Sequence, residues 1–164
     1  MPNKPFTGEA EIDFGEDVVR LVQLPASHTG GGDAAVLFIR RRVVHTGDAF
    51  FNGMYPSIHV PSGGSVAGCI AAVDKILSLA FDTVIPGHGP IARRADLERA
   101  RAYYAALWAH ALQETAAGKT AAQAVDEAPP ELRGLAGLPG VTSLARNVRL
   151  AMEEAARPRA SSQK

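Results

Sequence analysis

The sequence predicts an α/β domain in which one mainly antiparallel sheet is covered by helices. In the first half of the chain, short β-branched segments alternate with Gly, Asp and Arg clusters, as strands joined by hairpins require. The second half shows apolar residues at helical spacing, interrupted by one short apolar run. The chain has 164 residues, of which 46% are hydrophobic, so it suits one domain with a buried core better than two.

The expected strands are short and end at turn residues. They occupy residues 10–14, 18–24, 34–39, 43–45 and 82–86. Pro86 and Gly87 stop the last of them. Arg40, Arg41 and Arg42 lie between the third and fourth strands, and we expect them to form a solvated hairpin turn, with anion binding as the lesser alternative.

Four helices are expected. They are predicted at 65–80, from Asp96 to near Gly118, from Thr120 to the Pro129–Pro130 pair, and at about 142–156. Ser65 is a candidate N-cap for the first helix, whose apolar residues lie on one face. Thr120 and Gln123 form a capping-box pattern for the third.

Composition excludes several classes of protein. Lysine plus arginine equals aspartate plus glutamate at 17 each, so we expect no nucleic-acid partner. Cys69 is the only cysteine, which excludes an intrachain disulfide or a multi-cysteine metal site, and we expect it to be a buried hydrophobe. No apolar run suits a membrane span or a signal peptide, so we expect a cytoplasmic protein without a membrane partner. The expected organisation is one domain over residues 1–157 and a disordered tail over 158–164.

Three segments each place a metal-capable side chain just past an expected strand. They are LPASHTGGGD with His28, HTGDAFFNG with Asp48, and IPGHGP with His88. Two imidazoles and a carboxylate suit Zn²⁺, and also Fe or Mn, whereas the lack of thiolates argues against a structural zinc knuckle. Taken alone, each residue is more often a hydrogen-bonded turn residue, but the three together favour a metal site.

The remaining candidates have simpler explanations. We expect His45 to be a packed residue or one that supports a ligand, and His59 and His110 to be structural. The run Gly30–Gly32 is a weak candidate for an anion-binding nest, because no phosphate-loop lysine follows it.

Together these motifs resemble those of the metallo-β-lactamase-fold hydrolases. SHTGGGD is similar to that family's third-histidine loop, GDAFFNGMYP to its bridging-aspartate segment and VIPGHGP to its last-histidine loop, in the same order over roughly residues 8–110. The resemblance implies the C-terminal half of an αββα sandwich. It also implies that His28 serves one metal ion, that His88 serves a second, and that Asp48 bridges both. The implied activity is attack by a metal-bound hydroxide on an ester, thioester, amide or phosphoester.

The family's HxHxDH motif does not occur in this sequence. Its five histidines include no pair spaced two apart. Each ion would keep one histidine and a shared carboxylate, so we expect Zn²⁺ to bind weakly or incompletely and assign no catalytic residue. We expect the inner face of the sheet, including Val36, Phe38 and Val44, to lack its covering layer, which favours a homodimer or a separate N-terminal half-domain as partner.

Three functional interpretations follow. The first is a metal-dependent hydrolase of a small-molecule substrate, with the missing ligands supplied by another polypeptide or by a symmetry mate. The second is a non-catalytic half-domain or truncated remnant that acts as an interaction module. The third, an unrelated small α/β protein with structural histidines only, leaves the three ordered motifs to chance.

Overall fold

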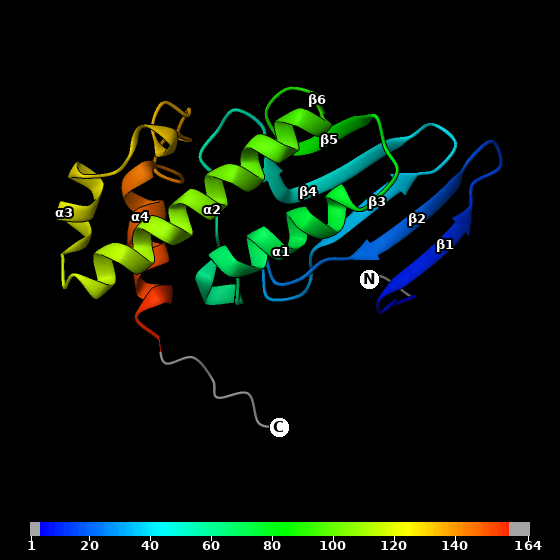
Figure 1. Cartoon of the computed structure of the whole chain (residues 1–164). Coiled ribbons are helices and arrows are strands. Elements are labelled where there is room, and N and C mark those ends of the chain that lie inside the picture. Colours follow the sequence, from blue (N-terminus) through cyan, green and yellow to red (C-terminus); the bar gives the residue numbers. More distant parts are fainter. Residues whose placement is uncertain (1–3, 158–164) are drawn as a thin grey trace.

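The structure is a computed structural model that describes residues 4–157. Six strands form one sheet in the order β1-β2-β3-β4-β5-β6 (Figure 1). Their bounds are Glu9–Asp13, Val18–Gln23, Ala34–Phe38, Val43–Phe51, Thr83–His88 and Ala92–Arg93. Among the neighbouring strands of this described sheet, β4 and β5 pair in parallel and the other pairs are antiparallel. The predicted mainly antiparallel sheet is therefore confirmed.

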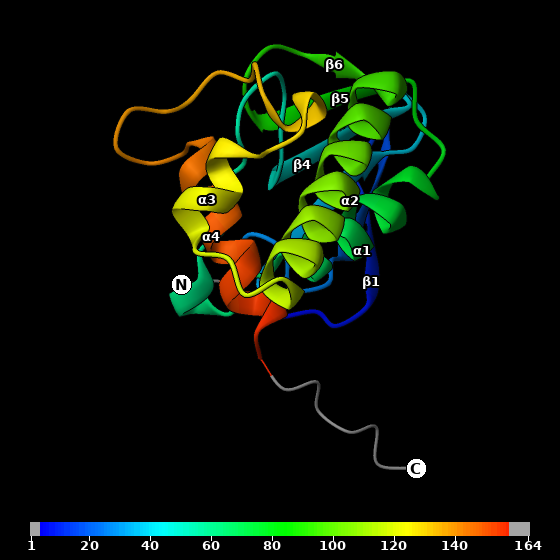
Figure 2. The same cartoon turned by 60° about the vertical axis from the view of Figure 1, so that its left-hand side comes forward.

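Helices cover one side of this sheet. The α-helices are α1 (Val66–Leu77), α2 (Arg94–Ala116), α3 (Ala121–Asp126) and α4 (Leu144–Ala155), and two short 3₁₀ helices, η1 and η2, span Val60–Ser62 and Pro130–Leu132. Helices α1 and α2 lie across the sheet, while α3 and α4 pack at the far end of α2 (Figures 1 and 2). Among the described residues, no helix is long and apolar enough to cross a membrane.

The predicted helix starts follow from capping. The Ser65 side chain accepts a hydrogen bond from the backbone N–H of Gly68, and Thr120 with Gln123 forms the expected capping box. The second helix begins at Arg94 rather than Asp96, because the Asp96 carboxylate reaches back to the backbone N–H of Arg93 at 2.8 Å. The predicted tail, residues 158–164, lies outside the described residues.

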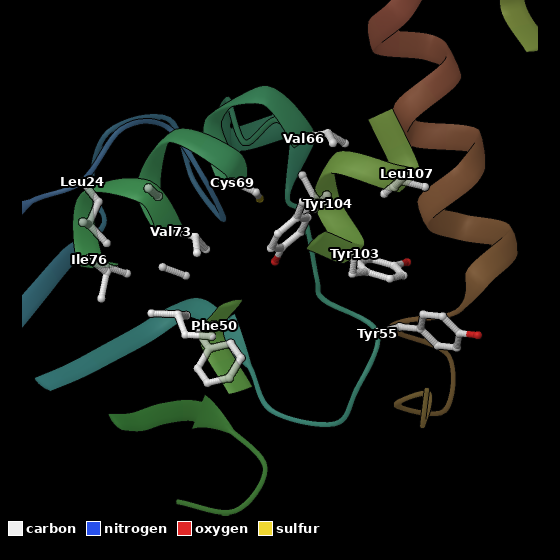
Figure 3. Packing of buried hydrophobic residues seen from close by; sticks show 14 of the residues in the cluster. Leu24, Phe50, Tyr55, Val66, Cys69, Val73, Ile76, Tyr103, Tyr104 and Leu107 are labelled. Carbon is white, nitrogen blue, oxygen red and sulfur yellow. The ribbon is translucent and has the colours of Figure 1, made fainter. Parts of the chain in front are cut away.

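The core lies between the sheet and the helices. It joins β2, β3, β4 and β5 to α1 and α2 through buried apolar side chains, several of which are drawn in Figure 3. Cys69 is buried there, as predicted. Val44 is fully buried in this core, which corrects the expectation that it would lie on the uncovered face. Successive residues of a strand point to opposite faces, so Val44 points into the core while its neighbour Val43 lies on the uncovered face.

The opposite face of the sheet carries apolar side chains that none of the described helices covers. Strand pairing places Val36 beside Leu21 and His45, and places Phe38 beside Val19 and Val43. Val36 and Phe38 are half-buried, as the prediction of an uncovered face requires. We call the residues Leu21, Val36, Phe38, Val43 and Ile85 the open face.

Strand β4 is longer than predicted. It continues past His45 to Phe51, with shifts in its register against β5 around Gly47. Asp48 therefore lies within an irregular strand, and His88 is the last residue of β5, so the prediction that both would follow a strand is wrong. The alternation of the segment stops at Thr46-Gly47, which is why the sequence suggested an end there.

The N-terminus of α1 depends on α4. The Glu154 carboxylate accepts hydrogen bonds from the backbone N–H groups of Val66 at 2.7 Å and Ala67 at 3.1 Å. These N–H groups have no partner within their own helix, and the positive end of the helix dipole favours a carboxylate there. Glu154 thus ties the last helix to the helix that packs beside the His28 loop.

Replacing Glu154 with Gln should lower the free energy of unfolding by about 1–2 kcal/mol, because the charged acceptor at the helix N-terminus is lost. Urea unfolding followed by circular dichroism measures the change. Glu153→Gln is the matched control, since Glu153 makes only an exposed ion pair with Arg149 and should cost about 0.5 kcal/mol or less. Equal losses in the two variants would contradict the assigned role of Glu154.

Candidate metal centre

The three predicted ligands meet at one edge of the sheet. Strands β2, β4 and β5 run in the same direction, since β3 is antiparallel to both β2 and β4, and β5 is parallel to β4. His28 follows β2, Asp48 lies in the last part of β4, and His88 ends β5. The topology therefore brings three segments that are far apart in the sequence to the same place.

The Asp48 carboxylate lies between the two imidazoles. Its Oδ2 atom is 3.6 Å from Nε2 of His28, and its Oδ1 atom is 3.4 Å from Nε2 of His88. All three side chains are partly exposed, with 21%, 39% and 44% of the His28, Asp48 and His88 side chains accessible. Each carboxylate oxygen thus has its own imidazole, at an edge that solvent reaches.

A backbone contact fixes the proton of His28. Its Nδ1 atom lies 2.8 Å from the carbonyl oxygen of Ser57. Because a carbonyl can only accept, Nδ1 must carry the hydrogen, and in the neutral ring Nε2 then presents a lone pair toward Asp48. A lone pair facing a carboxylate is repulsive unless a proton or a metal cation lies between them. Binding of Nδ1–H to a carbonyl is the arrangement that usually orients a metal-ligating histidine.

The distances also suit a cation. Two ligand atoms of one tetrahedral Zn²⁺, each about 2.0–2.1 Å from it, lie about 3.3 Å apart, close to the separations of 3.4 and 3.6 Å on the two sides of Asp48. Within residues 4–157, no group of three or more His, Cys, Asp or Glu side chains is arranged to hold an ion by itself. A cation beside either imidazole would therefore find two side-chain ligands among these residues, the imidazole and the Asp48 carboxylate.

The loop that carries His28 is held by Asp33. The Asp33 carboxylate accepts hydrogen bonds from the Ser27 hydroxyl at 2.7 Å and from both the backbone N–H and the hydroxyl of Thr29 at 2.8 Å. Burial alone would raise the pKa of Asp33, but these bonds and the nearby His28 outweigh it and lower the pKa. Asp33 thus anchors the residues on both sides of His28. The sequence places Asp33 at the end of the glycine run, but it does not show that the carboxylate turns back to bond Ser27 and Thr29.

The glycine run serves packing rather than anion binding. The N–H of Gly30 donates to the Ser62 carbonyl at 2.6 Å, and the N–H of Gly31 donates to the Thr29 carbonyl at 3.0 Å. Two donors of the suggested nest are therefore already used.

The arginine turn between β3 and β4 pairs with acidic residues. Arg42 makes a two-point ion pair with Asp82 at 2.6 and 2.8 Å.

The Asp48 carboxylate lies in close contact with Gly87. A Cβ atom at Gly87 would clash with Oδ1 of Asp48 and would lie 2.7 Å from the Gly47 carbonyl oxygen. Only a residue without a side chain allows the carboxylate to approach β5 this closely. At the end of β5, the Phe51 ring stacks on the His88 imidazole with the ring centroids 4.7 Å apart. Phe51 thereby restrains the orientation of His88, a role that the sequence did not reveal.

The other histidines lie in different surroundings. His110 is buried and its Nε2 bonds the Ala124 carbonyl at 2.8 Å, which confirms a structural role. His45 is exposed, and its Nδ1 accepts from the N–H of Gly47, so the expectation of a packed residue is wrong. His59 is exposed near the site, with its ring centroid 6.4 Å from that of His28, and its Nδ1 bonds the Ser62 hydroxyl at 2.7 Å.

Residues 2–88 match the sequence profile of the metallo-beta-lactamase superfamily. No curated protein matches the sequence. Solved structures with the same fold include a double mutant of the sec-alkyl sulfatase PisA1, with a TM-score of 0.73 and 19% identity. They also include the sec-alkylsulfatase Pisa1 from Pseudomonas sp., with a TM-score of 0.71 and 19% identity, and a metallo-beta-lactamase family protein from Thermus thermophilus, with 0.62 and 17%.

The chain spans only part of these proteins. The alignments cover 95% and 94% of this chain but 27% and 26% of the two alkylsulfatase chains. They cover 93% of this chain and 48% of the Thermus thermophilus protein. At these identities the likeness concerns the fold, and it agrees with the predicted half of an αββα sandwich.

A Gly87→Ala variant should bind Zn²⁺ at least about tenfold more weakly than the natural chain, because the added methyl group displaces the Asp48 carboxylate. Isothermal titration with zinc chloride measures the affinity, and circular dichroism verifies the fold. Gly32→Ala is the control, since its Cβ would lie 3.5 Å from the Thr29 hydroxyl oxygen, an ordinary contact. Unchanged zinc affinity in Gly87→Ala would show that Asp48 is not a ligand.

Proposed function

Because the chain belongs to the metallo-beta-lactamase superfamily, we propose that it provides the C-terminal half of a metal-dependent hydrolase site. The observation that carries this proposal is the placement of His28 and His88 on opposite oxygens of one carboxylate, at 3.6 and 3.4 Å. Members of the superfamily typically bind metal ions, and this donor set suits Zn²⁺, with Fe or Mn as alternatives. The proposed reaction class is hydrolysis of an ester, thioester, amide or phosphoester.

The chain's own residues have distinct parts in this proposal. His28 and Asp48 would hold one cation, and Asp48 and His88 would hold the other. Bound there, the cations would supply a water of lowered pKa and a positive charge to polarise the attacked group. Asp33 and the Ser57 carbonyl orient His28, and Phe51 orients His88. Two ligands hold a divalent ion weakly, so the proposed site needs further protein ligands before it can act.

The proposal places a second αβ half on the open face. The family's αββα sandwich packs two halves sheet against sheet, and the open face presents the apolar side chains that such packing buries. Either a second copy of this chain or a separate N-terminal half-domain could provide that layer. A half carrying the HxHxDH motif would also bring the missing ligands.

A non-catalytic half-domain is the second candidate function. It is favoured by one observation, namely that each proposed cation position has only two protein ligands among the described residues. In this case the open face alone would define the role of the chain, as a surface for association. The two candidates differ in whether assembly is accompanied by hydrolysis.

The open face should drive association of the purified chain. Native mass spectrometry should show dimers or larger assemblies for the natural sequence and monomers for Phe38→Asp, since a carboxylate on this face would be buried without a partner. Ile91→Asp is the matched control, because Ile91 is 72% exposed and does not belong to the open face. Assemblies that persist in Phe38→Asp would contradict association through this face.

Hydrolysis should depend on Asp48 and not only on assembly. We expect a zinc-loaded assembly that supplies the further ligands, from a second copy or from a half-domain carrying HxHxDH, to hydrolyse at least one of p-nitrophenyl acetate, a thioester and a phosphodiester. Asp48→Asn should reduce the rate by about a hundredfold or more without changing the assembly. Stoichiometric assembly with no hydrolysis of any probe would favour the non-catalytic half-domain. Unchanged hydrolysis in Asp48→Asn would contradict the proposed site.

A further inference from the structure

A cavity of about 430 Å³ lies between the end of β4 and the first half of α2. Phe50, Phe51 and Met54 form its wall on the β4 side, and Tyr103 and Tyr104 form part of its wall on α2. Figure 3 shows Phe50 on its strand and the two tyrosines on their helix. The volume falls within the range of about 300–1,000 Å³ that is typical of small-molecule sites.

A third segment closes the cavity. Glu131 and Leu135, at and after η2, complete its lining. This segment is pinned to the loop after β4 by backbone hydrogen bonds, from the N–H of Tyr55 to the Ala136 carbonyl at 2.8 Å and from the N–H of Ala136 to the Gly53 carbonyl at 3.2 Å. The cavity is therefore built from three elements held together, and its shape does not depend on a single loop.

The cavity adjoins the His88 side of the candidate metal centre. Phe51 lines the cavity and stacks on the His88 imidazole. Asn52 also lines it, and its backbone N–H donates to the His88 carbonyl at 2.9 Å while its side chain donates to the Pro90 carbonyl at 3.0 Å. A molecule in the cavity would thus touch the two residues that hold His88 in place.

The chemistry of the lining selects the occupant. Aromatic and aliphatic side chains form most of the wall, and the charged residues are Asp96, Arg99 and Glu131. Arg99 is already paired with Asp96, and the three groups together carry one net negative charge. An anionic group is therefore disfavoured there. An uncharged hydrocarbon or aryl group gives up little favourable hydration when it enters the cavity, and it buries apolar area there.

We propose that this cavity binds the uncharged apolar part of the substrate, an alkyl or aryl group next to the bond that is hydrolysed. That the bound molecule is a substrate rests on the proposed hydrolase function, but binding in the cavity needs neither a metal ion nor a reaction. Phe51 is then a wall shared by the bound apolar group and the His88 ligand. The cavity would make the enzyme selective for neutral, apolar esters or thioesters over charged ones.

Binding of the neutral dye Nile red to the purified, metal-free chain tests the proposal. Dye fluorescence gives the affinity, and NMR spectra should show shifts in the signals of Phe51, Met54, Tyr103 and the His88 imidazole. Phenyl butyrate, a neutral ester, should displace the dye, whereas its hydrolysis product butyrate should not. The Ala100→Phe variant, which fills the cavity from α2, should bind the dye at least about tenfold more weakly.

Two further variants separate loss of the cavity from other effects. Ala109→Phe places the same side chain on an exposed position of α2 outside the cavity and should leave the affinity unchanged. Ala102→Trp, at an exposed cavity position, should weaken binding even if Ala100→Phe does not fold. Dye shifts confined to the open face, or equal affinity in both cavity variants and the natural chain, would overturn the proposal. Dye binding in the cavity without hydrolysis by any assembly would leave the cavity in place and refute only the hydrolase function.

Discussion

The contact between one carboxylate and two imidazoles is the constraint around which this chain is arranged. Asp48 offers one oxygen to His28 and the other to His88, at separations longer than a direct hydrogen bond. The Ser57 carbonyl fixes the hydrogen of His28 on Nδ1, so the ring directs a lone pair at a negative group unless it gains a proton. A cation between the imidazole lone pair and the carboxylate would make the electrostatics of this cluster favourable. Such a pre-arranged set of donors is suited to binding a cation.

Much of the surrounding structure serves to hold these three groups. Asp33 closes the His28 loop, Gly87 lets Asp48 lie against β5, and Phe51 stacks on His88. The His28 loop also contacts the start of α1, where the Ser65 hydroxyl donates a hydrogen bond to the Ala26 carbonyl at 3.1 Å. A Cβ at Gly68 would overlap that same carbonyl oxygen, so loop and helix touch backbone to backbone. The N-terminus of α1 is in turn capped by Glu154 of α4, so the last helix supports the edge of the site through a chain of direct contacts.

The sequence predicted the elements better than their ends, and the ligands better than their supports. Within residues 4–157, alternation and helical spacing located five of the six strands and all four α-helices, but the two-residue β6 is too short to leave a pattern. Asp48 was expected past the end of a strand because Thr46-Gly47 interrupts the alternation, whereas pairing with β5 carries the strand on to Phe51. Likewise, the assignment of Val44 to the uncovered face was wrong because it needed the strand's absolute orientation, which depends on where α1 packs. Asp33 acts within its own loop, but the sequence does not show that its carboxylate turns back to Ser27 and Thr29. The stacking of Phe51 on His88 and the bridge from Met54 to Ala136 join segments that are far apart in the sequence.

The most direct test is X-ray diffraction, with data collected at the zinc absorption edge, from crystals of this chain grown with zinc chloride. If the Asp48 carboxylate organises the site, anomalous density should lie between Nε2 of His28 and Oδ2 of Asp48, between Nε2 of His88 and Oδ1 of Asp48, or at both places. Ligand distances of about 2.0–2.2 Å are expected there. Anomalous density only at other residues, or none at all with both imidazoles hydrogen-bonded directly to the carboxylate, would contradict this account and leave the three side chains as a structural ion-pair cluster.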